Sequence, residues 1–329
     1  MLPRFCTLLL GCSIALAQST LSGPSLGLVY DAKAQAIRPI WGIPGASTTG
    51  QPIATGFTVV SALISPAQDY ALAVSSDGSL NVVLFGSGSP TSQAVAGVTT
   101  PDRMVLSPTG SSAVLFYKTG TVQIVSGLPG SPSAGPQIDI TMLPNTPDVV
   151  AIADDATSIL AGVPENAPGD PAHGEVFLVP SDSSGPRSIA TVQHASALAF
   201  FAQSHDALIA DDAAATVVKM EDAAGAASPV WTFTDTNFTA PDSVQAAADG
   251  HLVFAASSKN GVLAILGGDG SNPIYVSCQC TPAELHPLAS TSLYQVTEPA
   301  NGLLWAFDAN LLNPRVLFIP VPDLGAAQQ

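Results

Sequence analysis

Residues 71 to 84 read Ala71-Leu-Ala-Val-Ser-Ser-Asp77-Gly78-Ser-Leu-Asn-Val-Val-Leu84, two apolar runs on either side of one turn signal. Each run has the length and the aliphatic content of a β-strand. An Asp-Gly pair between such runs is a favoured two-residue hairpin turn, because glycine adopts a positive φ without steric cost. The stretch therefore predicts an antiparallel hairpin.

Related hairpins recur along the chain with a period of about 40 residues, which is typical of propellers and solenoids. They span residues 26–43, 112–125, 159–178, 207–220, 252–266 and 293–307. A helical solenoid would need runs of ten or more residues with apolar spacing of three and four. The sequence has no such runs, so the repeat unit is built from strands.

Two further strands accompany each hairpin. An outer strand follows a Gly/Ser/Pro loop, as at 137–142, 230–234, 274–278 and 316–320. A short strand then opens the next unit, most visibly after Pro101, Pro147, Pro241 and Pro282. The pattern predicts an all-β fold, a seven-bladed β-propeller of four-stranded antiparallel blades that forms a single domain over residues 18–329.

The order of an apolar strand, a Ser-Pro-x-Gly turn and an Asp-Gly hairpin resembles the YVTN and lactonase-like class of secreted bacterial propellers. Ser107-Pro108-Thr109-Gly110 carries the full turn, while Ser65-Pro66 and Asp249-Gly250 carry parts of it. The resemblance covers about residues 21–323 and is one of architecture. Because this class includes enzymes, binding modules and surface proteins, the resemblance implies a fold and no single activity.

The N-terminal segment has the layout of a secretory signal peptide. Arg4 is its one charge, an apolar run extends from Phe5 to Leu16, and Ala15-Leu16-Ala17 is a small-x-small cleavage signal. We expect cleavage after Ala17, and hence a secreted or periplasmic protein without a transmembrane segment. Leu9-Leu10-Gly11-Cys12 is the looser alternative, in which Cys12 would be lipidated.

The charge composition narrows the range of partners. Nine Lys and Arg stand against 25 Asp and Glu, which gives a net charge of −16 at pH 7. Nucleic acid is excluded as a partner, because binding to a phosphate backbone needs clustered cations. We expect a monomer whose acidic surface suits neutral or cationic ligands, whether protein, glycan or small molecule.

Export and cleavage would leave Cys278 and Cys280 as the cysteines of the mature chain, two residues apart on a predicted strand. Side chains at i and i+2 of a strand lie near the limit of disulfide geometry, so a disulfide would need a local bend. The alternatives are a disulfide, a pair of packed thiols, and a redox or metal role.

Three aspartates, Asp102, Asp148 and Asp242, follow a proline at the start of an opening strand. A ring of carboxylates at the channel mouth could bind Ca²⁺, the one cofactor that the sequence suggests, because this ion prefers several oxygen ligands. The simpler interpretation is that each carboxylate accepts hydrogen bonds from nearby backbone amides in its turn.

The opening strands of the last two units carry polar residues where their counterparts are mostly apolar. Aligned on the preceding proline, Ser243 matches Glu284 and Gln245 matches His286. Glu284 and His286 are therefore candidate catalytic residues, as a general base and its positioning group, with Gln245 as a ligand-binding neighbour. The alternative is a polar channel lining that traps water.

The fourth hairpin has a long loop, 163–174, in place of a tight turn. It offers four polar side chains as candidate ligand-binding residues, namely Glu165, Asn166, Asp170 and His173. Long loops on rigid scaffolds often carry binding residues, although Pro- and Gly-rich insertions are also tolerated without a function. The doublets Asp154-Asp155 and Asp211-Asp212 are predicted to be solvated carboxylates in turns.

The sequence contains no Gly-x-Ser-x-Gly, His-Glu-x-x-His, Walker or dinucleotide-binding motif. The leading hypothesis is therefore an exported propeller that acts as a non-catalytic binding or surface-associated module. The rival is a lactonase-like or other hydrolase with a divalent cation near the channel, using Asp242, Glu284, His286 and the loop from Glu165. A structural element of the cell envelope, marked by an exposed apolar rim, is the third hypothesis.

Overall fold

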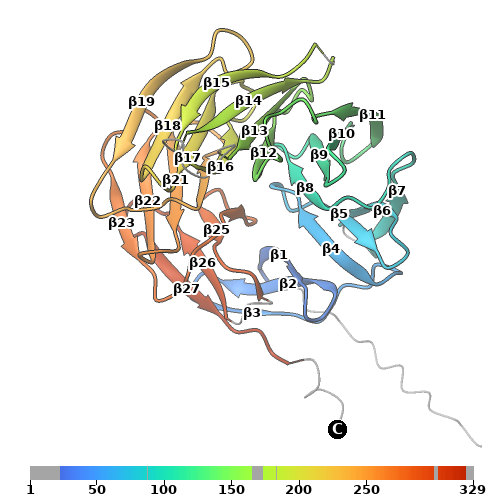
Figure 1. The fold of residues 1–329 in the computed structure, drawn as a ribbon. Helices are drawn as coiled ribbons and strands as arrows, with labels where there is room; N and C mark the ends of the chain where they lie inside the picture. Colours follow the sequence, from blue (N-terminus) through green and yellow to red (C-terminus); the bar gives the residue numbers. More distant parts are fainter. Residues whose placement is uncertain (1–22, 87, 165–172, 183, 300–302, 324–329) are drawn as a thin grey trace, which may run out of the picture.

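The computed structural model describes residues 23–86, 88–164, 173–182, 184–299 and 303–323. Seven antiparallel sheets are arranged as the blades of a closed ring (Figure 1). The described residues form strands, turns and loops and contain no helix. None of them thus belongs to a helix that could cross a membrane. The prediction of an all-β seven-bladed propeller is confirmed.

Each blade runs outward from the channel in chain order. The first four blades are β1 (Ser25–Asp31), β2 (Ala36–Ile43) and β3 (Ala46–Thr49); β4 (Val59–Ile64), β5 (Tyr70–Ser75), β6 (Leu80–Leu84) and β7 (Thr91–Ala94); β8 (Arg103–Leu106), β9 (Ser112–Tyr117), β10 (Thr121–Ser126) and β11 (Ser133–Asp139); and β12 (Val149–Ile152), β13 (Ser158–Val163), β14 (Gly174–Pro180) and β15 (Arg187–Val192).

The remaining three blades have the same order. They are β16 (Ala195–Phe200), β17 (Ala207–Asp211), β18 (Thr216–Glu221) and β19 (Ser228–Thr234); β20 (Ser243–Ala246), β21 (Leu252–Ser257), β22 (Val262–Gly267) and β23 (Ile274–Ser277); and β24 (His286–Pro287), β25 (Leu293–Gln295), β26 (Leu304–Asp308) and β27 (Arg315–Ile319). Six sheets thus have four strands, while the first blade has three in the described part of the chain.

The second strand of the typical blade is apolar on both faces, which explains the uninterrupted apolar runs of the sequence. All residues of β5, β9, β13 and β17 are buried. Outer strands face solvent, and every residue of β7 is exposed. An apolar cluster fills each interface between neighbouring blades. The cluster between the first two blades is small, and its buried residues are Val59, Ala73 and Val83. Stability therefore comes largely from packing between blades.

The hairpin turns have the backbone geometry that their glycines predict. Gly78, Gly120 and Gly261 have φ values of 86°, 88° and 64°. In the first of these turns, Asp77 Oδ1 accepts hydrogen bonds from Ser79 N at 3.0 Å and Ser75 Oγ at 2.5 Å. These bonds lower the pKa of Asp77 to about 2. The carboxylate therefore stabilises the turn in its ionised form.

The ring closes through the segment after the last strand rather than through a strand shared between blades. In Figure 1, β27 lies next to the first blade. Beyond it, the carbonyl of Pro320 accepts a hydrogen bond from Thr49 N at 3.1 Å, and that of Pro322 accepts one from Arg38. The last strand itself, β27, is the outer strand of the seventh blade.

Candidate functional site

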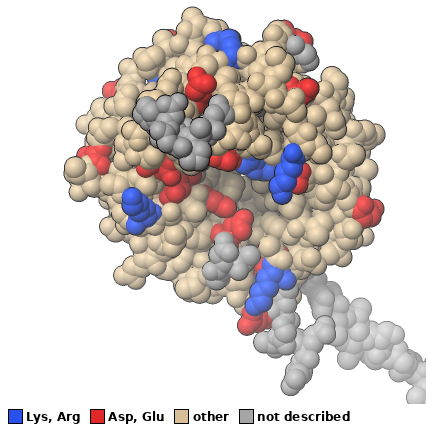
Figure 2. Space-filling model, in the orientation of Figure 1, with Lys and Arg blue, Asp and Glu red and all other residues tan. Residues whose placement is uncertain are grey.

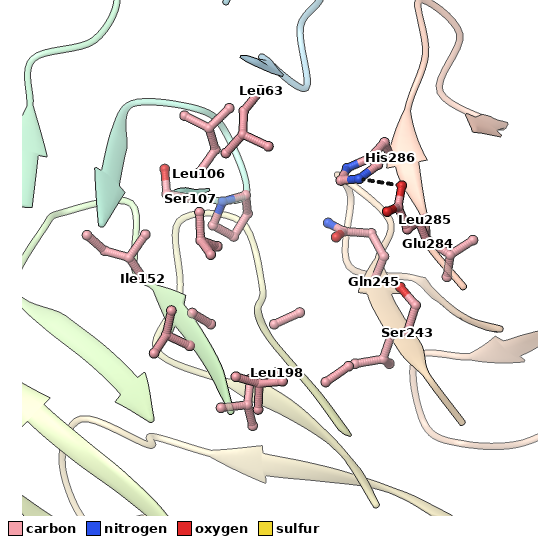
Figure 3. A pocket seen from close by; sticks show the side chains of 18 of the residues that line it. Leu63, Leu106, Ser107, Ile152, Leu198, Ser243, Gln245, Glu284, Leu285 and His286 are labelled. Atoms are coloured by element: carbon pink, nitrogen blue, oxygen red, sulfur yellow. Dashed lines mark ion pairs between the residues drawn. The ribbon is translucent and has the colours of Figure 1, made fainter. Parts of the chain in front are cut away.

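The channel at the centre of the ring contains a cavity of about 460 Å³. Six blades contribute their innermost residues to its wall, all except the first. Most of the wall is apolar, and Figure 3 shows Leu63, Leu106, Ile152 and Leu198 on one side of the cavity. These four side chains come from the opening strands of four consecutive blades.

The opposite wall is polar and comes from the last two blades. Figure 3 shows Ser243 and Gln245 on β20 next to Glu284 and His286 of the following blade. His286 Nε2 lies 3.1 Å from Glu284 Oε2, and the amide of Gln245 points toward His286. The structure thus brings together the residues that the alignment of the two opening strands had matched.

A second carboxyl group, that of Glu298, is a close neighbour of Glu284, and both line a side cavity of about 70 Å³. Burial raises the pKa of Glu298, and the charge of Glu284 raises it further. Burial alone would raise the pKa of Glu284 as well, but the neighbouring imidazole of His286 lowers it. Glu298 therefore keeps its proton to a higher pH than Glu284, and the two groups titrate as a pair.

Gln68 connects two strands that border the side cavity. Its Oε1 accepts a hydrogen bond from Leu28 N at 2.5 Å, and its Nε2 donates to the carbonyl of Pro287 at 2.7 Å. This side chain, on a turn of the second blade, thereby links the innermost strands of the first and seventh blades. Leu28 and Tyr30 line the side cavity rather than the main one.

Two of the three aspartates that were predicted to form a calcium ring bind turns of their own blades. Asp102 Oδ2 accepts a hydrogen bond from Lys118 N at 2.8 Å, and Asp242 Oδ2 accepts one from Ser258 N. This arrangement matches the simpler interpretation, in which the carboxylate holds the neighbouring hairpin turn. No group of three His, Cys, Asp or Glu in the described residues is placed to hold a metal ion.

The third aspartate, Asp148, belongs to a contact between blades. His194 Nε2 lies 3.4 Å from Asp148 Oδ2, and His194 Nδ1 lies 2.6 Å from Asp212 Oδ1. Partial burial alone would lower the pKa of His194, but Asp212 and Asp148 together raise it. The imidazole thus connects the start of β12 in the fourth blade to the β17–β18 turn of the fifth.

The predicted solvation of the two aspartate doublets is wrong for one member of each. Asp211 is buried, at 3% exposure, and accepts hydrogen bonds from Gln193 N and His194 N. Asp154 accepts hydrogen bonds from Thr109 N and Gln203 N, both at 2.8 Å. These carboxylates accept hydrogen bonds from backbone amides of neighbouring segments. Such contacts cannot be predicted from the turn propensity of the local sequence.

The long loop of the fourth blade lies mostly outside the described residues, and with it the candidates Glu165, Asn166 and Asp170. His173 is described and exposed. The signal peptide and Cys12 also lie outside the described residues. These four binding residues and the cleavage site remain predictions.

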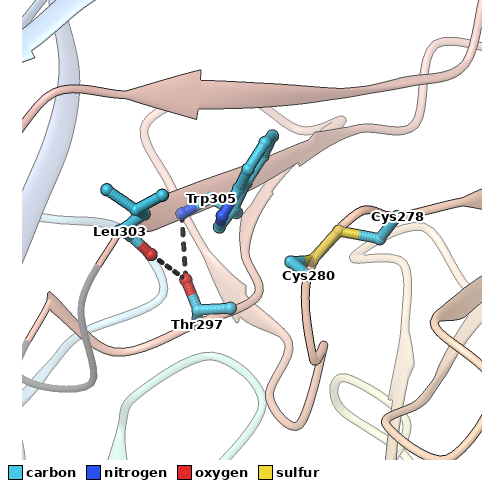
Figure 4. The surroundings of a disulfide bond; sticks show 5 residues. All are labelled: Cys278, Cys280, Thr297, Leu303 and Trp305. Carbon is cyan, nitrogen blue, oxygen red and sulfur yellow. Dashed lines mark hydrogen bonds between the residues drawn. A yellow bond between two sulfur atoms is a disulfide. The ribbon is translucent and has the colours of Figure 1, made fainter.

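Cys278 and Cys280 form a disulfide (Figure 4), with their Cα atoms 5.0 Å apart. The expectation that both cysteines lie on a strand is wrong, because β23 ends at Ser277 and the chain bends at the disulfide. Cys280 packs with Trp305 at the interface of the last two blades. This bend is the one that two cysteines at i and i+2 need in order to form a disulfide.

Glu298 and His194 were not among the residues predicted from the sequence. Glu298 follows β25, the second strand of the seventh blade. Local sequence could not show that it lies near Glu284, because this depends on the antiparallel register between β24 and β25. The pairing of His286 with Gln295 places Glu284 near residue 297, so the register was the usable signal. His194 gave no local signal, since its two partners are distant in the sequence.

No protein-family model and no curated protein matches the sequence. Solved structures do match. A protein described as functionally unknown from Desulfotomaculum acetoxidans DSM 771 superposes with a TM-score of 0.58 at 13% identity, over 91% of this chain and all of the other. A "putative 6-phosphogluconolactonase" from Bacteroides fragilis NCTC 9343 gives a TM-score of 0.59 at 14% identity, over 90% of this chain and 92% of the other.

This chain shares its propeller fold with these structures. A second protein described in the same words, from Bacteroides uniformis ATCC 8492, gives a TM-score of 0.57 at 12% identity, over 91% of this chain and 96% of the other. The predicted architectural resemblance is therefore confirmed. Because a fold hosts many activities, the function has to be argued from the channel.

Proposed function

We propose that this protein is an exported, non-catalytic binding module whose ligand occupies the central channel. The observation that carries the proposal is the cavity of about 460 Å³ with an apolar wall and a polar wall. Ligand pockets typically enclose about 300–1,000 Å³, with mostly apolar linings and a few polar groups that orient the ligand. The channel has both properties.

Two features support export. The first 17 residues have the layout of a signal peptide. The disulfide between Cys278 and Cys280 suits an oxidising compartment, since cytosolic thiols are kept reduced.

A thermal-shift screen of small molecules tests the channel as the ligand site. A ligand at 100 times its Kd stabilises the folded protein by about 2.7 kcal/mol. Leu198→Trp should abolish the shift, because the indole would occupy the cavity. Val230→Trp on the exposed face of β19 is the matched control and should leave the shift intact. A ligand that stabilises both variants equally would move the site away from the channel.

Hydrolysis is the second candidate function, because a protonated and an ionised carboxyl group beside a histidine can act as general acid and base. Glu298, Glu284 and His286 provide these groups. The two Bacteroides structures with related folds are each described as a "putative 6-phosphogluconolactonase", which makes lactones the first substrates to test. Acid release from simple lactones in a pH-stat should then fall at least a hundredfold in Glu284→Gln. Rates equal to the buffer blank would remove this candidate.

A calcium site at Asp102, Asp148 and Asp242 is tested by thermal unfolding with and without Ca²⁺ after chelation. A ligand that binds only the folded state must raise its stability. A rise in Tm that Asp242→Ala abolishes would support the site and, with it, a metal-dependent hydrolase. An unchanged Tm at millimolar Ca²⁺ would contradict it.

A further inference from the structure

We infer that the channel ligand is an amphipathic amine, with an ammonium group between Glu284 and Glu298 and an apolar body against Ile152 and Leu198. The inference rests on the proposed function, because it names the chemical class of ligand for the channel cavity together with the side cavity, which shares Leu63, Glu284 and His286 with it. It follows from the charges of the wall, the state of one carboxylate oxygen and the position of the apolar surface.

The charged side chains of the two cavities favour a cation. Arg103 and His286 are the basic residues that line them, against Glu284 and Glu298. The Arg103 guanidinium donates to the carbonyls of Pro147 and Asp148 and lies 5.0 Å from the centre of the Phe116 ring. Two of its nitrogens are therefore bound to carbonyls of the wall, while its buried Nε has no hydrogen-bond partner. Arg103 lines the main cavity, whereas the side cavity that holds both glutamates has His286 as its basic residue.

Glu284 has unused capacity to accept a hydrogen bond. Its Oε2 is fully buried and accepts no hydrogen bond, although His286 Nε2 lies 3.1 Å away. A buried acceptor without a donor costs free energy, which a ligand that supplies the donor recovers. An ammonium group has three N–H donors and no acceptor, so it can bind both carboxylates. Figure 2 shows further acidic side chains gathered around the hollow at the middle of this face.

The rest of the cavity requires the ligand to be apolar beyond its ammonium group. Leu63, Leu106, Ile152 and Leu198 lie on the side away from Glu284 in Figure 3. Each methylene added to the ligand should tighten binding about fourfold until the cavity is full, as apolar transfer predicts. The site thus selects for a charged end and an apolar end at once.

Binding of an ammonium group should release a proton. The titratable groups that face Glu298 are Glu284, His286 and Tyr30. A cation between the two glutamates takes the place of the proton that Glu298 holds, so amine affinity should rise with pH until Glu298 is ionised in the free protein. A neutral ligand of the same length should show no such dependence.

Isothermal titration calorimetry of the mature chain with hexylamine, 1-hexanol and hexanoate tests the inference. Hexylamine should bind at least tenfold more tightly than hexanol, and hexanoate should bind most weakly. Glu284→Gln and Glu298→Gln should each lower hexylamine affinity at least tenfold without changing hexanol affinity. Asp182→Asn, which removes an exposed charge in the fourth blade, is the charge-matched control and should change neither.

The remaining outcomes of these titrations would each contradict either the amine class of the ligand or the role of the two glutamates. Hexanol binding as tightly as hexylamine would overturn the amine class while leaving the channel as the site. An equal loss in Asp182→Asn would show attraction by net charge and would also overturn it. If the Glu variants do not fold, the wild-type titration in two buffers of different ionisation enthalpy decides, since absence of proton release contradicts the inference. The thermal-shift screen with Leu198→Trp tests the proposed function itself, independently of these titrations.

Discussion

Arg38 is the most deeply buried cation of the described chain, at 2% exposure, and it holds three segments together. Its guanidinium lies 2.7 Å from Asp31 Oδ2 and donates to the carbonyls of Gly50 and Pro322. A charge in this position is stable only while all its partners remain, because desolvation of an unpaired ion costs several kcal/mol. One side chain thereby couples the first hairpin to the end of the chain.

Arg38→Ala should lower the free energy of unfolding by about 3–5 kcal/mol, since it leaves Asp31 buried without its cation. Lys33→Ala is the control in the same blade, because the Lys33–Asp323 pair at 3.4 Å is exposed. Its cost should stay below about 1 kcal/mol. Urea unfolding of both variants measures the difference. Similar losses of unfolding free energy would show that burial does not determine how much an ion pair stabilises this protein.

His194 should make the stability of the ring depend on pH. Its pKa is raised in the folded protein, so its contact with Asp148 and Asp212 contributes fully below the unfolded value of about 6.5 and is lost as pH rises through the folded pKa. The difference in unfolding free energy between wild type and His194→Asn should therefore shrink from pH 6 to pH 8.5. His173→Asn, at an exposed histidine, should show no such trend. A difference that grows with pH would reverse the assignment.

At the scale of the blade, neighbouring elements are joined by turns as well as by apolar clusters. The carboxylate of Asp154, between β12 and β13, accepts hydrogen bonds from Thr109 in the third blade and from Gln203 in the fifth. Its two oxygens thus join three blades on one face of the ring. Asp182, by contrast, accepts a hydrogen bond from Ser184 of its own loop.

Asp154→Ala should cost about 0.5–1.5 kcal/mol of unfolding free energy, because it removes the acceptor of two exposed backbone N–H groups of other blades. Asp182→Ala is the matched control, and it should cost clearly less, because its hydrogen bond stays within its own loop. Denaturant unfolding monitored by tryptophan fluorescence compares the two. Equal costs would mean that Asp154 acts only within its own turn.

Local signals were sufficient to predict the blades but not the whole site. The hairpin at Asp77-Gly78 could be predicted because turn geometry depends on two adjacent residues. Glu284 and His286 could be matched because residues at i and i+2 share one face of a strand. Glu298 could not be found in this way, because its position depends on the register of a second strand. Predicting the cavity itself would require the relative placement of six blades.

At the scale of the whole molecule, the ring is closed by about four residues beyond β27. Removal of residues 320–329 should lower the free energy of unfolding by a few kcal/mol, because Thr49 and Arg38 lose their hydrogen-bond acceptors at Pro320 and Pro322. Removal of residues 324–329 alone is the control and should change little. Thermal unfolding of the two truncated chains measures the effect, and an unchanged Tm in the shorter one would show that the blades close the ring without this segment.

The same closure sets an order of events during synthesis. Thr49 and Pro320 are 271 residues apart, so at ribosomal speeds the first blade waits roughly 14–54 s for the segment that covers its edge. During that time β3 presents an unpaired strand edge, which is a template for pairing with other chains. A nascent chain of this protein therefore exposes that edge to pairing with other chains until the last blade emerges.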